Sequence, residues 1–124
     1  MFENIQRGEY ETSKGTMYFR SKWEANYALY LDWLLKQEQI LEWEYEPQPF
    51  YEFPIKHGTT RYLPDFRVYN NDGSWYLVEI KGYSQGMVKL KRMKKYHPHI
   101  KIELVDAKAY NDLKRKLGKV LNFY

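Results

Sequence analysis

Two acidic residues and a lysine stand where buried strands are expected, and their types suit phosphate chemistry. Asp65 follows Pro64, while Glu79 and Lys81 flank Ile80. A folded sheet tolerates buried charge only when the charges are paired or hold a metal ion. Carboxylate oxygens are the ligands that Mg²⁺ prefers. A lysine can lower the pKa of an attacking water or neutralise charge that develops on a phosphate. The three residues together therefore suit the binding of a cation and a phosphate group.

A predicted β-hairpin brings these residues together. Residues 61–69 and 74–81 have the composition of strands, and the four residues between them predict a turn. Because side chains alternate along a strand, Glu79 and Lys81 face one side of the sheet and their apolar neighbours face the other. Pairing around the turn is expected to bring Asp65 near Glu79.

The remaining elements predict a single α/β domain over residues 1–124. Their order is α-β-β-β-α-β-α, and we expect a mixed central sheet of about four to five strands flanked by helices. Residues 1–15 are polar and aperiodic, and they predict a flexible arm or an edge ribbon. The expected helices cover residues 22–37, 85–96 and 107–117, and the expected further strands cover 16–20, 40–46, 50–55 and 100–105.

The first predicted helix begins with an acidic residue of its own. Ser21 and Glu24 match the Ser-x-x-Glu capping box, which satisfies backbone N–H groups at the start of a helix. Glu24 therefore has a structural explanation that needs no chemistry.

Charge is distributed unevenly along the chain. Residues 1–80 contain 8 basic and 13 acidic residues, whereas residues 81–124 contain 12 basic and 3 acidic residues. A basic segment beside an acidic remainder is expected of a protein that binds a polyanion such as DNA and has a separate acidic centre. A solvated, lysine-rich surface is the simpler explanation, so charge alone does not decide between the two.

The composition also excludes several classes of site. Cysteine is absent, which excludes disulfides, thiolate catalysis and cysteine zinc sites, and suits a reducing compartment. No apolar run reaches the length of a membrane span, and the N-terminus has no signal-peptide pattern. We therefore expect a cytoplasmic protein without a membrane partner.

The motifs resemble those of the PD-(D/E)XK nuclease superfamily. Pro64-Asp65 is similar to its PD element, and Glu79-Ile80-Lys81 is similar to its (D/E)XK element at the usual hairpin separation. The flanking residues and a basic helix that ends at His97-Pro98 resemble small phage and mobile-element endonucleases, which include Holliday junction resolvases. The resemblance covers residues 17–105.

The resemblance implies a restriction-endonuclease-like core and a set of site residues. Asp65 and Glu79 would be ligands of Mg²⁺, for which Mn²⁺ can substitute. The backbone carbonyl of Ile80 would be the remaining ligand that the protein contributes to the metal ion. Lys81 would be the catalytic lysine. Glu24 is similar to a helical glutamate that these enzymes add to the site, as a further ligand or as a residue that positions metal-bound water. Whether Glu24 is a ligand or a helix cap stays open.

The basic helix and the segment before it contain the expected DNA contacts. Gln85 occupies a region where related enzymes often place a polar residue near the scissile phosphate, and Tyr83 is expected near the substrate. Lys89, Arg92 and Lys95 are expected to face outward from the helix, where solvation alone would explain them. Beside a phosphodiester-cleaving site, phosphate contact is the better explanation.

The substrate is expected to be DNA of a particular shape. The chain has no room for a separate sequence-reading domain. The leading interpretation is a Holliday junction resolvase that acts as a symmetric homodimer on branched DNA during recombination and repair. One alternative is the nuclease subunit of a transposition, restriction or repair system to which a partner protein gives specificity. Another is a non-catalytic DNA-binding module on a nuclease fold.

Overall fold

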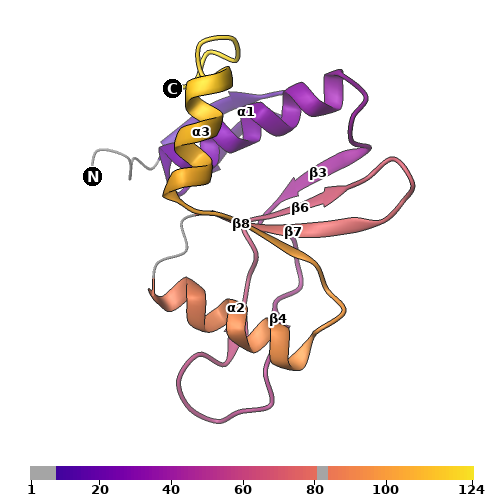
Figure 1. Ribbon diagram of the computed structural model, residues 1–124, viewed down its shortest axis with the longest axis vertical. Coiled ribbons are helices and arrows are strands. Elements are labelled where there is room, and N and C mark those ends of the chain that lie inside the picture. The colour runs from indigo at the N-terminus through magenta and orange to yellow at the C-terminus, as the bar shows by residue number, and fades with distance from the viewer. Residues whose placement is uncertain (1–7, 81–83) are drawn as a thin grey trace.

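A mixed four-stranded sheet organises the protein (Figure 1). The structure is a computed structural model that describes residues 8–80 and 84–124, with the side chains of residues 84–86 outside the description. The strands in the sheet lie in the order β3-β6-β7-β8, and only β7 and β8 are parallel. Their bounds are Glu42–Tyr45 for β3, Phe66–Tyr69 for β6, Trp75–Ile80 for β7 and Ile102–Val105 for β8. The predicted α/β class with a mixed sheet is confirmed.

Helices cover both faces of this sheet (Figure 1). Helices α1 (Lys22–Lys36) and α3 (Ala107–Leu117) share one hydrophobic cluster with the sheet, whereas α2 (Ser84–Tyr96) packs in a second cluster on the opposite face. Val78 belongs to the first cluster and Leu77 to the second. This division follows from the alternation of side chains along β7. The three predicted helices are confirmed to within one residue at each end.

The strand predicted over residues 61–69 is wrong in one respect, because it is interrupted before Asp65. Residues Arg61–Tyr62 form β5, which pairs with β4 (Tyr51–Glu52) in a ribbon of its own, and β6 begins at Phe66. Pro64 has no N–H group to donate to a neighbouring strand, so a continuous ladder cannot pass through it. Asp65 therefore lies at the point where the main sheet opens.

The N-terminal segment is an ordered hairpin over the part that the structure describes. Strands β1 (Gly8–Thr12) and β2 (Gly15–Phe19) pair with each other and join no other sheet. Ser13 donates to the buried Asp32 of α1 through its backbone N–H at 2.9 Å and its hydroxyl at 2.5 Å. Residues 8–15 are thus part of a ribbon tied to α1, which agrees with the second of the two expected alternatives and not with the flexible arm.

None of the helices within residues 8–80 and 84–124 combines the length and the apolar character that a membrane crossing requires.

Candidate active site

The acidic pair that the sequence singles out lies where β6 begins and β7 ends. The register pairs Phe66 with Val78, so Asp65 extends β6 to a position opposite Glu79. Side chains that are directly opposite in an antiparallel pair have Cβ atoms about 4.5–5.5 Å apart. The Asp65 Oδ2 atom accepts a hydrogen bond of 2.7 Å from the backbone N–H of Ile80. The strand break at Pro64 therefore places one carboxylate against the end of the strand that holds the other.

These carboxylates face a cavity of about 400 Å³. The lining contains four acidic residues, three basic residues and an exposed aromatic ring. Its members are Arg20, Glu24, Glu46, Phe50, Arg61, Leu63, Asp65, Glu79, Ile80 and Lys89. We call this cavity the carboxylate cleft.

Two tyrosine hydroxyls hold the carboxylates of the cleft in place. Tyr62 donates to Glu79 Oε1 at 2.8 Å, and Tyr45 donates to Glu24 Oε1 at 2.5 Å. The Tyr62 side chain is 1% exposed, so packing fixes the direction of its hydroxyl group. Each glutamate is thereby oriented by a residue of a neighbouring strand.

Burial and mutual repulsion raise the pKa of both central carboxyl groups. For Asp65, burial raises the pKa well above the ordinary value, and the charges of Glu79 and Glu24 raise it further, while the Ile80 N–H lowers it. For Glu79, burial raises the pKa to about 7, the hydrogen bond from Tyr62 and the charge of Lys89 oppose the rise, and Glu24 adds to it. Two full negative charges at this site are therefore unfavourable at neutral pH without a compensating cation.

The carboxylate cleft offers carboxylate oxygens, which are the type of ligand that a hard divalent cation such as Mg²⁺ or Mn²⁺ prefers. Among the residues whose side chains the structure describes, the hydrogen bond to Asp65 reaches Oδ2 and the hydrogen bond to Glu79 reaches Oε1. The described side chains do not form a ready group of three acidic or histidine ligands around one point. The cleft therefore has suitable oxygen ligands without a closed coordination shell.

Glu24 belongs both to the cap of helix α1 and to the carboxylate cleft, the two alternatives that the sequence left open. Its backbone N–H donates to the hydroxyl of Ser21 at 3.1 Å, which confirms the N-cap. Its carboxylate accepts from Ser21 and Tyr45 and lines the carboxylate cleft. The side chain is 9% exposed, which is unusual for a glutamate that only caps a helix.

The predicted DNA contacts on α2 have different surroundings. Lys89 lines the carboxylate cleft, and its charge lowers the pKa of Glu79. Arg92 does not project freely as expected, because its guanidinium donates to the carbonyl of Thr59 and is half-buried. Lys95 is exposed, with its amino group 5.1 Å from the ring centre of Tyr96.

Three further predicted site residues cannot be placed in this geometry. Lys81 and Tyr83 lie outside the described residues. Gln85 belongs to the first turn of α2, but its side chain lies outside the description as well. Their roles stay predictions.

Glu46 is an acidic residue of the cleft that the sequence motifs do not single out. Glu46 lies opposite Asp65 by the register of β3 and β6, which pairs Tyr45 with Phe66, and its N–H donates to the carbonyl of Asp65 at 2.7 Å. Arg20 forms an ion pair of 3.1 Å with the Glu46 carboxylate. The sequence pattern that could have indicated Glu46 is the acidic residue at every second position of 42–46. Such spacing places the three side chains on one face of a strand, and the last of them lies in the site.

Residues 9–117 match the family described as Protein of unknown function (DUF1064). The chain belongs to this family. The matched segment extends from β1 to the end of α3, so it contains Glu24, Asp65 and Glu79. A search of curated proteins gave no match.

Replacing Tyr62 with phenylalanine is expected to raise the pKa of Glu79 further. The Tyr62 hydrogen bond stabilises the ionised carboxylate, and hydrogen bonds to charged groups contribute about 1.5–3 kcal/mol, so its loss should raise the pKa by about one to two units. Carbon-detected NMR titration of the glutamate side chains measures the change. Tyr69→Phe is the matched control, because the Tyr69 hydroxyl donates to Glu44 at 2.8 Å outside the cleft. An unchanged Glu79 titration in Tyr62→Phe would contradict this account.

Proposed function

We propose that this chain is a metal-dependent endodeoxyribonuclease of the PD-(D/E)XK type. The observation that carries the proposal is the position of Asp65 beside Glu79, in a cleft where burial raises the pKa of both carboxyl groups. A buried acidic pair is costly to a fold and occurs preferentially at functional sites. The helix and strand order and the mixed sheet support a restriction-endonuclease-like core.

In this proposal the carboxylate cleft holds the cation and the cleaved phosphate. When bound, Mg²⁺ or Mn²⁺ would supply positive charge for the attacking and leaving oxygens of the phosphodiester. Asp65 and Glu79 would hold the cation together with the carbonyl oxygen of Ile80. Glu24 would contribute another oxygen or accept a hydrogen bond from the attacking water. Lys89 would bind a phosphate beside the cleaved bond, which its place in the cleft lining supports.

The reaction would be hydrolysis of the phosphodiester. A water oxygen would form a bond to phosphorus while the bond from phosphorus to the leaving oxygen breaks. The water proton would pass to solvent or to a carboxylate, and the leaving oxygen would take a proton from solvent. Lys81 would neutralise the charge that develops on the phosphate, a role that follows from the motif alone. Binding and positioning supply most of the acceleration in phosphoryl transfer, which suits a site of rigidly held carboxylates.

The proposed substrate is branched DNA, and the proposed active form is a symmetric homodimer. A resolvase cuts two strands placed symmetrically about a branch point, and two identical sites related by two-fold symmetry provide this most simply. Most of the described basic residues after position 80 lie on α2 and α3, which flank the cleft end of the sheet (Figure 1). Paired copies would join these surfaces across the arms of a junction.

The test is cleavage of labelled four-way junctions and matched linear duplexes, with and without Mg²⁺. We expect a dimer in analytical ultracentrifugation, metal-dependent paired nicks on the junction, and at least tenfold tighter binding of the junction, which is about 1.4 kcal/mol. Ca²⁺ should permit binding with little cleavage, because its looser coordination positions the water poorly.

Two other outcomes would identify a different function. A monomer that cuts both DNAs equally would favour a nuclease subunit directed by a partner protein. Binding without cleavage in any metal would favour a non-catalytic DNA-binding module. Full activity in excess chelator would exclude the metal mechanism.

A further inference from the structure

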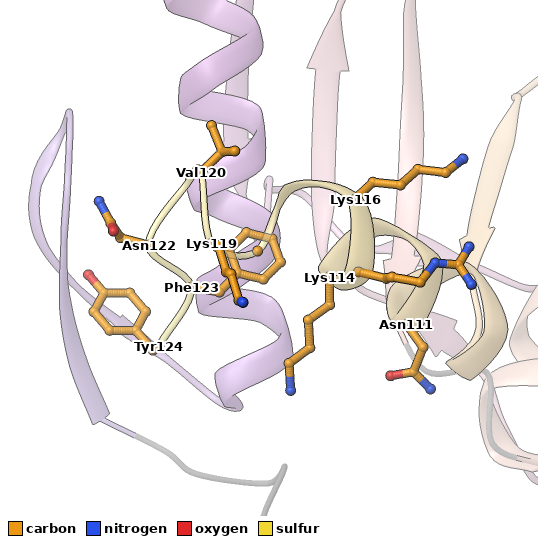
Figure 2. Close-up of a pocket in the computed structure, with 10 residues that line it drawn as sticks. Asn111, Lys114, Lys116, Lys119, Val120, Asn122, Phe123 and Tyr124 are labelled. Carbon is orange, nitrogen blue, oxygen red and sulfur yellow. The ribbon is translucent and has the colours of Figure 1, made fainter.

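A basic hollow of about 1010 Å³ lies between the C-terminal half of α3 and the segment that follows it (Figure 2). Four cationic residues and no acidic residue contribute to its lining. Its members are Asn111, Lys114, Arg115, Lys116, Gly118, Lys119, Val120, Asn122, Phe123 and Tyr124. Figure 2 shows the side chains of Lys114 and Lys119 extending in the same direction, away from the ribbon. We call this surface the α3 basic hollow.

Most of the positive charge in the α3 basic hollow is not neutralised by the described part of the chain. Arg115 pairs with Asp112 at 3.1 Å, whereas Lys114, Lys116 and Lys119 are exposed and pair with no acidic residue that the structure describes. Cations in the last turn of a helix interact favourably with its dipole, which explains residues 114–116. That explanation does not extend to Lys119, which lies beyond the end of α3.

The α3 basic hollow has a fixed position relative to the carboxylate cleft. Strand β8 is parallel to β7 and pairs Val105 with Ile80, so α3 begins at the same edge of the sheet as the cleft. The rings of Trp23 and Tyr110 stack at 4.1 Å and join α3 to the start of α1, next to Glu24. At a rise of about 1.5 Å per residue, the last turn of α3 lies about 10–15 Å from that edge.

We infer that the α3 basic hollow binds the sugar–phosphate backbone of the DNA that crosses the carboxylate cleft. Figure 1 shows α2 on one side of the cleft end of the sheet and α3 on the other. A strand in contact with Lys89 on α2 would leave the cleft toward α3. With a rise of about 3.4 Å per base pair, contacts in the hollow would fall about three to four nucleotides from the cleaved bond. This inference rests on the proposed nuclease function and adds the direction in which its DNA runs.

The first test removes two charges from the hollow. Lys114→Gln with Lys119→Gln should reduce the slope of log affinity against log salt by about 1.8, because each phosphate contact contributes about 0.9. Cleavage at saturating DNA should stay within about twofold, because phosphate contacts position the duplex and the chemistry lies elsewhere. The matched control is Lys36→Gln with Lys101→Gln, two exposed lysines that line neither the cleft nor the hollow. The control should leave the salt slope unchanged.

The second test locates the DNA directly. Because the chain has no cysteine, a single Lys119→Cys variant can carry a photo-crosslinker, and crosslinks should appear about three to four nucleotides to one side of the cleavage position. Lys36→Cys with the same reagent should give none. An unchanged salt slope and the absence of Lys119 crosslinks, in a protein that still cuts DNA, would overturn the inference and leave the nuclease intact. A salt-slope change in a protein that binds DNA without cutting would support the hollow and overturn the nuclease.

Discussion

Glu79→Gln is expected to lower the rate of DNA cleavage by about two to three orders of magnitude or more, and Asp65→Asn should do the same. Each change removes one negative charge that would hold the cation, and loss of a charge aimed at the transition state typically costs about 10²–10³-fold or more in rate. The amide side chains keep the shape of the carboxyl groups and can still accept from Tyr62 and Ile80. Single-turnover cleavage of labelled DNA measures the effect.

The same variants should remain folded, which separates chemistry from structure. Because repulsion and burial raise the pKa of Asp65 and Glu79, removing one charge should leave the melting temperature unchanged or higher in Mg²⁺-free buffer at pH 8. The matched control is Glu44→Gln, since Glu44 lies on β3, bonds to Tyr69 and does not line the cleft. Cleavage at the wild-type rate by Glu79→Gln would remove Glu79 from the mechanism.

Glu24→Gln distinguishes the two roles of Glu24. The variant keeps the backbone N–H that donates to Ser21, so the helix cap survives and the melting temperature should change little. A cleavage loss of about tenfold or more would then assign the carboxylate to the site. A lower melting temperature with normal cleavage at saturating Mg²⁺ would leave it with a structural role alone.

Without divalent metal, stability is expected to fall as pH rises from about 4.5 to about 7. Glu79 has an ordinary pKa of 4.5 in the unfolded chain and a pKa of about 7 in the folded protein, so the folded state holds a proton that the unfolded state has released. The free energy of unfolding therefore decreases with pH in this window, by up to about 3 kcal/mol for Glu79. The stabilisation that comes from protonated Glu79 is fully present below pH 4.5 and is lost above about pH 7. Protonation of Asp65 stabilises the folded protein in the same direction.

Thermal unfolding of the wild type and Glu79→Gln across pH 4 to 9 isolates this contribution. The difference in melting temperature between the two proteins should shrink or change sign toward low pH. The reason is that only the wild type is stabilised by protonation of residue 79. Mg²⁺ should stabilise the wild type at pH 8 more than at pH 5, because carboxylates bind the cation in their ionised form. Parallel curves for the wild type and Glu79→Gln, with no effect of Mg²⁺, would contradict both the raised pKa and the proposed cation site.

Local sequence signals were sufficient for the elements that position the site. The start of α1 follows from Ser21, and the hairpin of β6 and β7 follows from strand composition around a polar turn. Both depend on contacts between residues close in sequence, so a pattern within a short window predicts them. The interruption before Asp65 had a visible cause in Pro64, yet the strand was predicted to continue through it. A proline does not itself reveal whether the flanking residues pair with the same strand or with different ones.

Long-range contacts decided the rest of the site. Glu46 joins the cleft because β3 pairs with β6, and Arg92 turns toward Thr59 because the loop before β5 packs on α2. Tyr45 and Tyr62 appeared in the sequence as two tyrosines among 13. Their hydroxyls became specific donors to Glu24 and Glu79 only when elements far apart in the sequence met.

The sequence by itself determined which chemistry was available: acidic residues at hairpin spacing, a capped helix with Glu24 in its first turn, and a basic C-terminal third. Residue types and short spacings carry this information because they depend on neighbours along the chain. Only the tertiary structure decided that Asp65, Glu79 and Glu24 share one cleft, and that α2 and α3 lie on opposite faces of the sheet. Burial and distance exist only in the folded chain, so the raised pKa values of the central carboxyl groups are properties of the fold.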